Sequence, residues 1–223
     1  MTNAPESSVN VFLQSCCPAD GERFIGQCQH LFQLLEEYNR HTNLTRITGA
    51  AEFWSKHVAD SLSIGLFFPA LRTTSLQLAD IGCGAGFPSL ILAMAYPELQ
   101  ITAIDSIGKK TAFVQEAGQK LGLTNLRVVT ARSREMIHQE QWREKFDIIT
   151  ARAVADARTI FRESRNMLKA SGQFIFYKTP QQLQEDLPLV VSASLKHQLK
   201  WYTTPVFELP SDGGSRQFLY SGR

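Results

Sequence analysis

The spacing of apolar residues changes once along the chain, close to residue 75. Before this point, apolar residues recur at the three- and four-residue spacing of an amphipathic helix, most clearly between Arg23 and Arg40. A polar turn follows Tyr38, and a second helical pattern begins near Ala51. We therefore predict that residues 1–71 form a helical extension.

From Leu76 onward, short apolar runs alternate with amphipathic stretches. We predict strands at 76–81, 100–104, 127–130, 146–150 and 172–178, weaker strands near 199–203 and 217–220, and helices at 88–96, 109–121 and 157–168. Strand–helix alternation is typical of a parallel, doubly wound α/β sheet. A chain of 223 residues suits one such domain, residues 72–223, preceded by the helical extension.

A glycine-rich loop follows the first predicted strand. Gly82, Gly84 and Gly86 stand at every second position, and Pro88 then opens the next helix. Glycine adopts positive φ angles and lets a ligand approach the backbone. Because open α/β sheets bind ligands at the carboxyl ends of their strands, we expect this loop to bind a cofactor.

Two acids indicate which cofactor the loop binds. Asp105 ends the second strand, about 20 residues beyond the glycines, where a carboxylate can accept both hydroxyls of a ribose. The G-x-G-x-G spacing differs from the dinucleotide pattern G-x-G-x-x-G, and Asp80 directly precedes it. A carboxylate repels a pyrophosphate but suits an amino group and a sulfonium. The pair therefore favours S-adenosylmethionine over NAD.

Composition narrows the picture only slightly. The net charge of +2 neither requires nor excludes a nucleic-acid partner, so any RNA contact has to come from local clusters of Lys and Arg. The four cysteines lack metal-ligand spacing, and Cys28 with His30 fits ordinary helix positions better than a metal site. Cys83, inside the glycine loop, has no neighbouring base and is interpreted as a packing residue rather than a nucleophile.

The first residues and the apolar runs bear on location. The N-terminal residues lack the basic and apolar blocks of a signal peptide, and the longest apolar stretch, 62–71, is too short to cross a bilayer. We expect a cytoplasmic protein without a membrane, metal or protein partner, and a monomer.

An ordered set of short motifs resembles the bacterial 16S rRNA guanine-N7 methyltransferases, long called glucose-inhibited division protein B. The set runs in order from about Tyr38 to Lys178, most of the chain. Its members are Asn43-Leu44-Thr45, Lys56-His57, Asp60-Ser61-Leu62, Asp80 through Pro88, Asp105-Ser106, Lys109-Lys110, Phe113 and Arg152-Ala153-Val154-Ala155. One glycine motif is a weak signal, whereas this ordered set is specific.

The resemblance implies a fold, a cofactor and a reaction. The fold would be the Rossmann-like class I methyltransferase fold, α/β, with a mostly parallel seven-stranded sheet. S-adenosylmethionine would donate a methyl group to N7 of a single guanine, guanine 527, of 16S rRNA. The cofactor-binding residues that the resemblance implies are Asp80, Gly82, Gly84, Gly86, Phe87, Asp105, Ser133, Arg134 and Arg152.

The chemistry of N7 suits what the sequence offers. N7 carries a free lone pair and no proton at neutral pH, so in-line transfer requires alignment rather than a general base. The Asn/Asp-Pro-Pro-aromatic motif typical of exocyclic-amine methyltransferases is absent after the fourth strand, where Thr150-Ala151-Arg152-Ala153 stands instead. The Pro-Cys pair often used by pyrimidine C5 methyltransferases is absent too.

Two positions depart from the family pattern. After the third strand the family usually has Arg-x-Glu, whereas this chain has Arg132-Ser133-Arg134, with Arg134 where the acid is expected. Ser133 and Arg134 can still meet the adenine through backbone atoms. After the fifth strand the usual Lys-Gly is Lys178-Thr179, which puts the conformation of that loop in doubt.

Several polar residues near the expected site keep more than one interpretation. Arg152 contacts the cofactor, holds O6 of the guanine as the catalytic residue, or forms a structural ion pair with an acid such as Asp80. His57 and Asp60 share one helix face and are expected to order the helical extension over the site, with a general-base role for His57 less favoured. Asn43 and Thr45 cap the next segment or touch RNA.

Basic residues suggest where RNA binds. Lys109 and Lys110 stand beside Asp105, and with Arg46, Lys56, Arg132 and Lys178 they would form a rim for phosphates. A helix over 156–169 would carry Arg158, Arg162, Arg165 and Lys169 on one stripe, which is either an RNA surface or a solvated face. The expected partner is 16S rRNA or the 30S subunit, with Asn43 and His57 also near the substrate.

Three other functions stay open on the sequence. A methyltransferase for another RNA, a small molecule or a protein would turn over without 16S rRNA. An NAD-dependent oxidoreductase is disfavoured by the glycine spacing and Asp80. A catalytically silent RNA-binding module would bind rRNA and leave N7 unmodified.

Overall fold

The computed structural model describes residues 4–16, 18–42, 44–45 and 49–222. Its central sheet has the strand order β3-β2-β1-β4-β5-β8-β6, and a short strand β7 pairs with β8 outside this path. Strands β1 to β5 are parallel, and β8 is antiparallel to both of its neighbours, β5 and β6. This arrangement confirms the predicted doubly wound, mostly parallel α/β sheet.

The strand positions follow the sequence pattern closely, except at the end of the chain. The strands are β1 (Gln77–Ile81), β2 (Gln100–Asp105), β3 (Leu126–Thr130), β4 (Phe146–Arg152), β5 (Leu168–Lys178), β6 (Lys200–Thr203), β7 (Phe207–Leu209) and β8 (Gly214–Gly222). The C-terminal strand is longer than the predicted 217–220, and β7 was not predicted.

Helices cover both faces of the sheet. The α-helices are α1 (Ser7–Ser15), α2 (Gly21–Thr42), α3 (Ala50–Glu52), α4 (Asp60–Leu62), α5 (Ile64–Phe67), α6 (Ala70–Thr73), α7 (Ser89–Ala95), α8 (Gly108–Lys120), α9 (Ser133–Met136), α10 (Ala157–Ser164) and α11 (Pro180–Ser194). A π-helical turn, η1 (Phe53–Ala59), joins α3 to α4, and short 3-10 turns η2 (Glu140–Trp142), η3 (Arg165–Met167) and η4 (Leu195–His197) complete the set.

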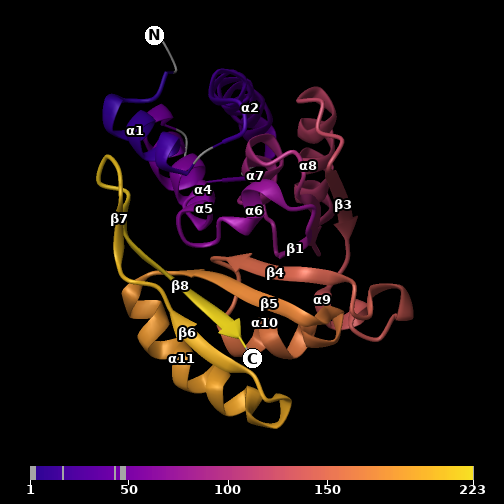
Figure 1. Ribbon diagram of the computed structural model, residues 1–223. Coiled ribbons are helices and arrows are strands. Elements are labelled where there is room, and N and C mark those ends of the chain that lie inside the picture. The colour runs from indigo at the N-terminus through magenta and orange to yellow at the C-terminus, as the bar shows by residue number, and fades with distance from the viewer. Residues whose placement is uncertain (1–3, 17, 43, 46–48, 223) are drawn as a thin grey trace.

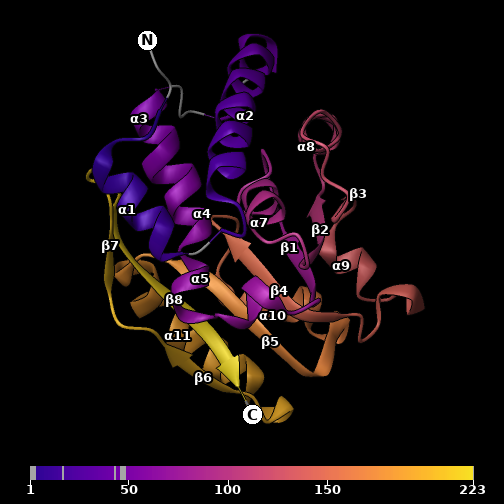
Figure 2. The same ribbon diagram turned by 45° about the horizontal axis from the view of Figure 1, so that its top comes forward.

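The N-terminal helices share one face of the sheet with α7 and α8, while α10 and α11 cover the other face (Figure 1; Figure 2). Because side chains alternate along a strand, consecutive residues of β1 and β4 enter different hydrophobic cores. Leu78 and Ile148 pack with the N-terminal helices, whereas Ala79 and Ile149 pack with α10 and α11. The division of the chain at residue 71 stays a prediction.

Two local predictions were wrong in the second half of the chain. The helix predicted over 157–168 ends at Ser164, and Leu168 and Lys169 belong to β5, which begins four residues earlier than the predicted strand at 172–178. Lys169 therefore does not continue an arginine stripe, and its ammonium pairs with Asp147 at 2.9 Å. Helix α11 was missed because Pro188 lies inside it, although Thr179 caps its start through a capping box.

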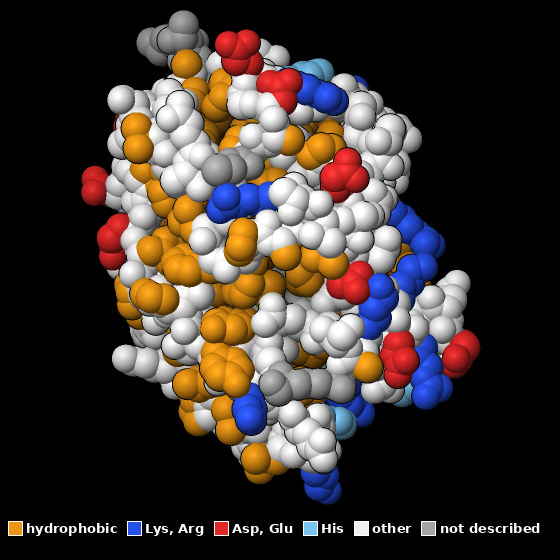
Figure 3. Space-filling view, viewed as in Figure 1, with side chains coloured by type: hydrophobic (Ala, Val, Ile, Leu, Met, Phe, Trp, Pro, Cys, Tyr) orange, Lys and Arg blue, Asp and Glu red, His pale blue; other side chains and the backbone are white. Residues whose placement is uncertain are grey.

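The surface carries mixed charges. On the face shown in Figure 3, apolar side chains gather mainly to the left, and Lys and Arg lie mostly along the right-hand edge beside several acidic side chains. No helix within the described ranges is long and apolar enough to cross a membrane.

Candidate cofactor and substrate site

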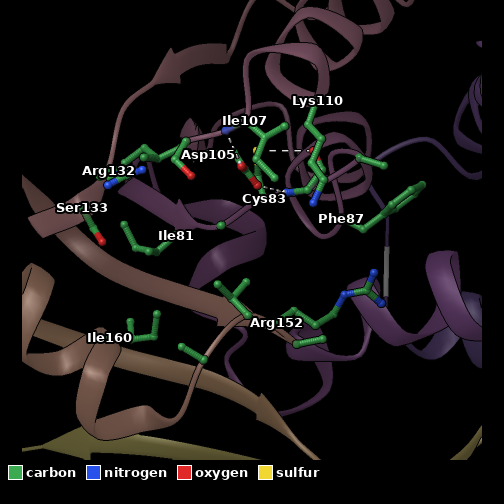
Figure 4. Close-up of a pocket in the computed structure, with 18 of the residues that line it drawn as sticks. Ile81, Cys83, Phe87, Asp105, Ile107, Lys110, Arg132, Ser133, Arg152 and Ile160 are labelled. Atoms are coloured by element: carbon green, nitrogen blue, oxygen red, sulfur yellow. Dashed lines mark hydrogen bonds between the residues drawn. The ribbon is translucent and has the colours of Figure 1, made fainter. Parts of the chain in front are cut away.

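One cavity of about 640 Å³ opens at the carboxyl ends of β1, β2, β3 and β4. The segments that follow these strands line it, together with Leu44, Thr45 and His57 from the N-terminal part. In Figure 4, Arg132, Ser133 and Ile160 lie at one end of the cavity, and Phe87 and Arg152 lie at the other. The position at the strand ends is the one that the sequence predicted.

The glycine loop forms the floor of this cavity. Gly82, Gly84 and Gly86 all have positive φ angles, of 70°, 57° and 89°. A Cβ on Gly82 would collide with the side chain of Val154, from the segment after β4, whereas Gly84 is open on its side-chain position. The absence of a side chain at Gly82 therefore lets Val154 pack against the loop, and Gly84 leaves space beside the backbone for a ligand.

Asp105 stands at the centre of the cavity wall. Its carboxylate accepts hydrogen bonds from the backbone N–H groups of Gly84 and Ile107, each at 2.9 Å. These bonds fix the glycine loop to the end of β2 and orient the carboxylate. Each oxygen keeps a second lone pair, so Asp105 is suitably placed to accept hydroxyls from a ribose.

Asp80 does not line the cavity, contrary to the expected contact with the cofactor. It shares a strand face with Leu78, so its side chain points under the loop, where it is fully buried and accepts a hydrogen bond from Ser89. Its Oδ1 atom has no partner among the described residues. Burial raises the pKa of Asp80 to about 6, and the Ser89 hydroxyl and the Arg152 cation oppose this shift.

Arg152 belongs to a buried ion network that the sequence suggested only in part. Its Nη1 donates to Asp60 at 3.0 Å and to the Lys56 carbonyl at 2.8 Å, and Asp60 also accepts from Nε of Arg216 at 3.1 Å. The structural pair therefore involves Asp60 rather than Asp80. Arg152 has the same parity along β4 as Ile148, which directs it to the N-terminal helices. No sequence pattern singled out Arg216.

His57 completes this network on the cavity wall. Its ring stacks on Phe87 at a centroid distance of 4.0 Å, Nδ1 lies 3.2 Å from an Arg152 nitrogen, and Nε2 lies 3.2 Å from Oγ1 of Thr45. Burial, and secondarily the Arg152 cation, lower the pKa of His57 to about 3. Because a guanidinium only donates, Nδ1 accepts, and we assign the proton of the neutral ring to Nε2.

Two cysteines were considered in the sequence, Cys83 as a nucleophile and Cys28 as a metal ligand. Cys83 is buried in the loop, and burial raises the pKa of its thiol far above the usual range, so it is unsuited to act as a thiolate nucleophile. Cys28 is buried as well. Across the described ranges, no cluster of three or more His, Cys, Asp or Glu side chains is arranged to hold a metal ion.

The structure separates the residues of the predicted basic rim. Lys110 lines the cavity with Arg132 and Arg134, and the exposed Lys109 donates to the Thr42 carbonyl at 3.3 Å. Lys178 does not join them, because it is buried and pairs with Asp186 at 2.6 Å. Lys56 is partly exposed and pairs with Glu52. Asn43 and Arg46 lie outside the described residues.

The end of the cavity near β3 holds a residue that the sequence did not indicate. Ser133 lines this end, as expected, and its hydroxyl donates to Oε2 of Glu163 at 2.7 Å. Glu163 projects from α10 and lines the cavity as well. It was missed because α10 was considered only for its basic residues, and nothing in the linear pattern relates position 163 to position 133.

Comparison with known proteins decides the family. The model of the GidB family, described as rRNA small subunit methyltransferase G, matches residues 25–209. The chain belongs to this family. It is 43% identical over 158 residues to the ribosomal RNA small subunit methyltransferase G of Limosilactobacillus reuteri, covering 69% of this chain and 66% of that protein. It is 41% identical over 189 residues to that of Levilactobacillus brevis, covering 84% and 78%.

The matched region covers a different share of each relative's length. The matched part spans slightly less than two thirds of the L. reuteri protein and of the Gloeobacter violaceus relative, which is 39% identical, at 66% and 63% of their lengths. The family assignment rests on the matched residues, which include the glycine loop, Asp105 and Arg152.

Solved structures agree on the fold. A SAM-dependent methyltransferase from Aquifex aeolicus has a TM-score of 0.51 at 16% identity, covering 68% of this chain and 85% of that one. M. jannaschii TYW2 in complex with AdoMet has a TM-score of 0.52 at 12% identity, covering 69% and 71%. The cavity fits the S-adenosylmethionine that the sequence predicts, because Gly84 leaves room beside the backbone and Asp105 faces the space.

We predict a pH-dependent effect for Asp80→Asn, measured without cofactor. The folded-state pKa of Asp80, about 6, lies above its ordinary value of 3.8. Its contribution to stability is therefore complete below pH 3.8 and lost as the pH rises through 6. Asparagine cannot ionise, so the free energy of unfolding of the variant, relative to wild type, should rise by about 3 kcal/mol between pH 4 and pH 8.

Urea denaturation at both pH values measures this change. The exposed variant Asp212→Asn is the control and should show no such trend. A constant difference between Asp80→Asn and wild type across this pH range would show that the side chain is not held as described.

We predict that Asp60→Asn lowers the free energy of unfolding by about 3–5 kcal/mol, because two largely buried guanidinium groups lose their common carboxylate. Urea denaturation at pH 7 is the measurement. Glu52→Gln, which breaks the exposed pair with Lys56, is the matched control and should change stability by less than about 1 kcal/mol. Equal effects of the two variants would contradict a structural role for the Asp60 network.

Proposed function

We propose that this protein transfers the methyl group of S-adenosylmethionine to N7 of a single guanine, guanine 527, of bacterial 16S rRNA. The proposal rests on the charge and protonation of the side chains at the cavity end formed by Phe87, His57 and Arg152. This end presents a fixed cation and a neutral imidazole, and none of the described side chains there is poised to remove a proton from a substrate.

The lack of an available base among the described residues at this end supports attack by an atom that already has a lone pair. Nδ1 of His57 is bonded to Arg152, and Nε2 carries the proton that faces Thr45. Bound S-adenosylmethionine supplies an electrophilic methyl group on its sulfonium. N7 of guanine forms the new bond as the carbon–sulfur bond breaks, and no proton moves, so the protein has to align and shield the reacting atoms.

Arg152 is the residue we assign to guanine. Its bonds to Lys56, Asp60 and His57 use three of the five N–H groups of the guanidinium, and in the described part of the chain the other two have no partner. Guanine O6 lies next to N7 and accepts hydrogen bonds from arginine. We infer that Arg152 holds O6 while N7 faces the methyl group, with the target base taken out of its stack.

The charge of the cavity supports an anionic partner. Lys110, Arg132, Arg134 and Arg152 line it, against the carboxylates of Asp105 and Glu163. The cofactor itself carries a sulfonium, so the excess of cations suits phosphate groups of RNA better than the cofactor alone. Such contacts position the RNA and leave the choice of base to groups such as Arg152.

The test is methyl transfer from labelled S-adenosylmethionine to 30S subunits, or to 16S rRNA, that lack the N7 modification, followed by mapping of the modified base. We expect one N7-methylguanine at position 527. Transfer to a small molecule or protein without RNA, or binding of rRNA without transfer, would overturn the proposed substrate and reaction.

We predict that Lys109→Glu/Lys110→Glu weakens RNA binding and lowers the slope of log affinity against log salt concentration by about 1–2, since each phosphate contact contributes somewhat less than one unit. Filter binding across a salt series measures this. Lys196→Glu/Lys200→Glu changes the same charge at exposed positions that do not line the cavity, and should leave the slope unchanged. Equal slopes for both pairs would remove Lys109 and Lys110 from the RNA surface.

A further inference from the structure

We propose that Glu163 of α10 accepts a hydrogen bond from the 6-amino group of the cofactor's adenine and thereby selects adenine over other purines. The inference concerns the cofactor, whose identity does not depend on the methyl acceptor discussed above.

The position of the adenine follows from the two unlike ends of the cavity. Asp105, which is suited to a ribose, lies between them (Figure 4). The end near Arg152 carries the cation and the imidazole, whereas the end near β3 is lined by apolar side chains. These are Ile81, Ile104, Ile107, Ala131 and Ile160. A flat purine ring fits the apolar end, where burial of its faces is favourable.

The polar groups at this apolar end are few. Ser133 and Glu163 close it from α9 and α10, and Arg132 and Arg134 stand beside them. An amino group donates hydrogen bonds, and an arginine side chain has no acceptor. The side chain at position 134 therefore cannot receive the amine. Among the described side chains that line the apolar end, Glu163 is the carboxylate that can.

The carboxylate of Glu163 is already oriented for this contact. Ser133 is buried, and its hydroxyl donates to Oε2 at 2.7 Å, which fixes the plane of the carboxylate. Ile160 stands one helical turn before Glu163 and lines the same wall, so both side chains leave α10 toward the cavity. Oε1 has no hydrogen-bond partner among the described residues, and a carboxylate accepts up to about four bonds.

The test is a binding cycle with two ligands and three forms of the full-length protein. The ligands are S-adenosylhomocysteine and its analogue in which the 6-amino group is replaced by hydrogen. Isothermal titration calorimetry measures both affinities for wild type, Glu163→Gln and Glu163→Ala. Wild type should prefer the amino form by about 10-fold or more, because the acceptor is charged. The ratio should fall to an intermediate value in Glu163→Gln, whose amide oxygen still accepts, and to near 1 in Glu163→Ala.

Glu135 provides the matched control. It is an exposed carboxylate next to Arg134 that does not line the cavity, so Glu135→Ala should keep the wild-type ratio. Glu163→Gln preserves the size of the side chain, and its thermal unfolding establishes that the fold is intact. An unchanged ratio in Glu163→Gln and Glu163→Ala, a ratio near 1 in wild type, or a loss of preference in Glu135→Ala would each overturn the proposal.

Discussion

The arrangement of the site depends on one carboxylate that serves two guanidinium groups. Asp60 lies in the N-terminal helical part, Arg152 at the end of β4, and Arg216 on β8, with β5 between those two strands. Each charge is largely shielded from water, so any one left alone would be costly. By fixing Arg152, Asp60 also determines the tautomer of His57, and through it the contact with Thr45. The N-terminal helices are thus part of the cavity wall rather than an added layer.

Much of the fold could be predicted because it follows from local patterns. The strands from Gln77 to Lys178 are visible in the sequence as apolar runs. The alternating glycines predict a turn whose backbone conformation would be obstructed by larger side chains at Gly82 and Gly86. Asp105 was placed correctly because the carboxyl ends of neighbouring parallel strands meet at one edge of the sheet. Helix α11 was not predicted because Pro188 interrupts its helical pattern, although a proline can lie within a helix where the surrounding packing compensates.

The errors at the site have a different origin. A charged residue near a strand end can face either side of the sheet, so Asp80 was assigned to the cofactor although strand parity directs it beneath the loop. Lys178 was counted as a surface cation because its partner, Asp186, lies on the helix that was missed. Glu163 comes to the cavity through the packing of α10 beside α9, a relation between distant elements that no motif records.

The wide sequence separation within the Asp60 network has a consequence for how the protein assembles. Asp60 is 92 positions from Arg152 and 156 from Arg216, so these contacts close very long loops and require β4 and β8 to have docked beside the N-terminal helices. A partly folded chain that has formed β1, β2 and the glycine loop still lacks one wall of the cavity. A ligand that fills the complete cavity therefore stabilises the whole fold by mass action.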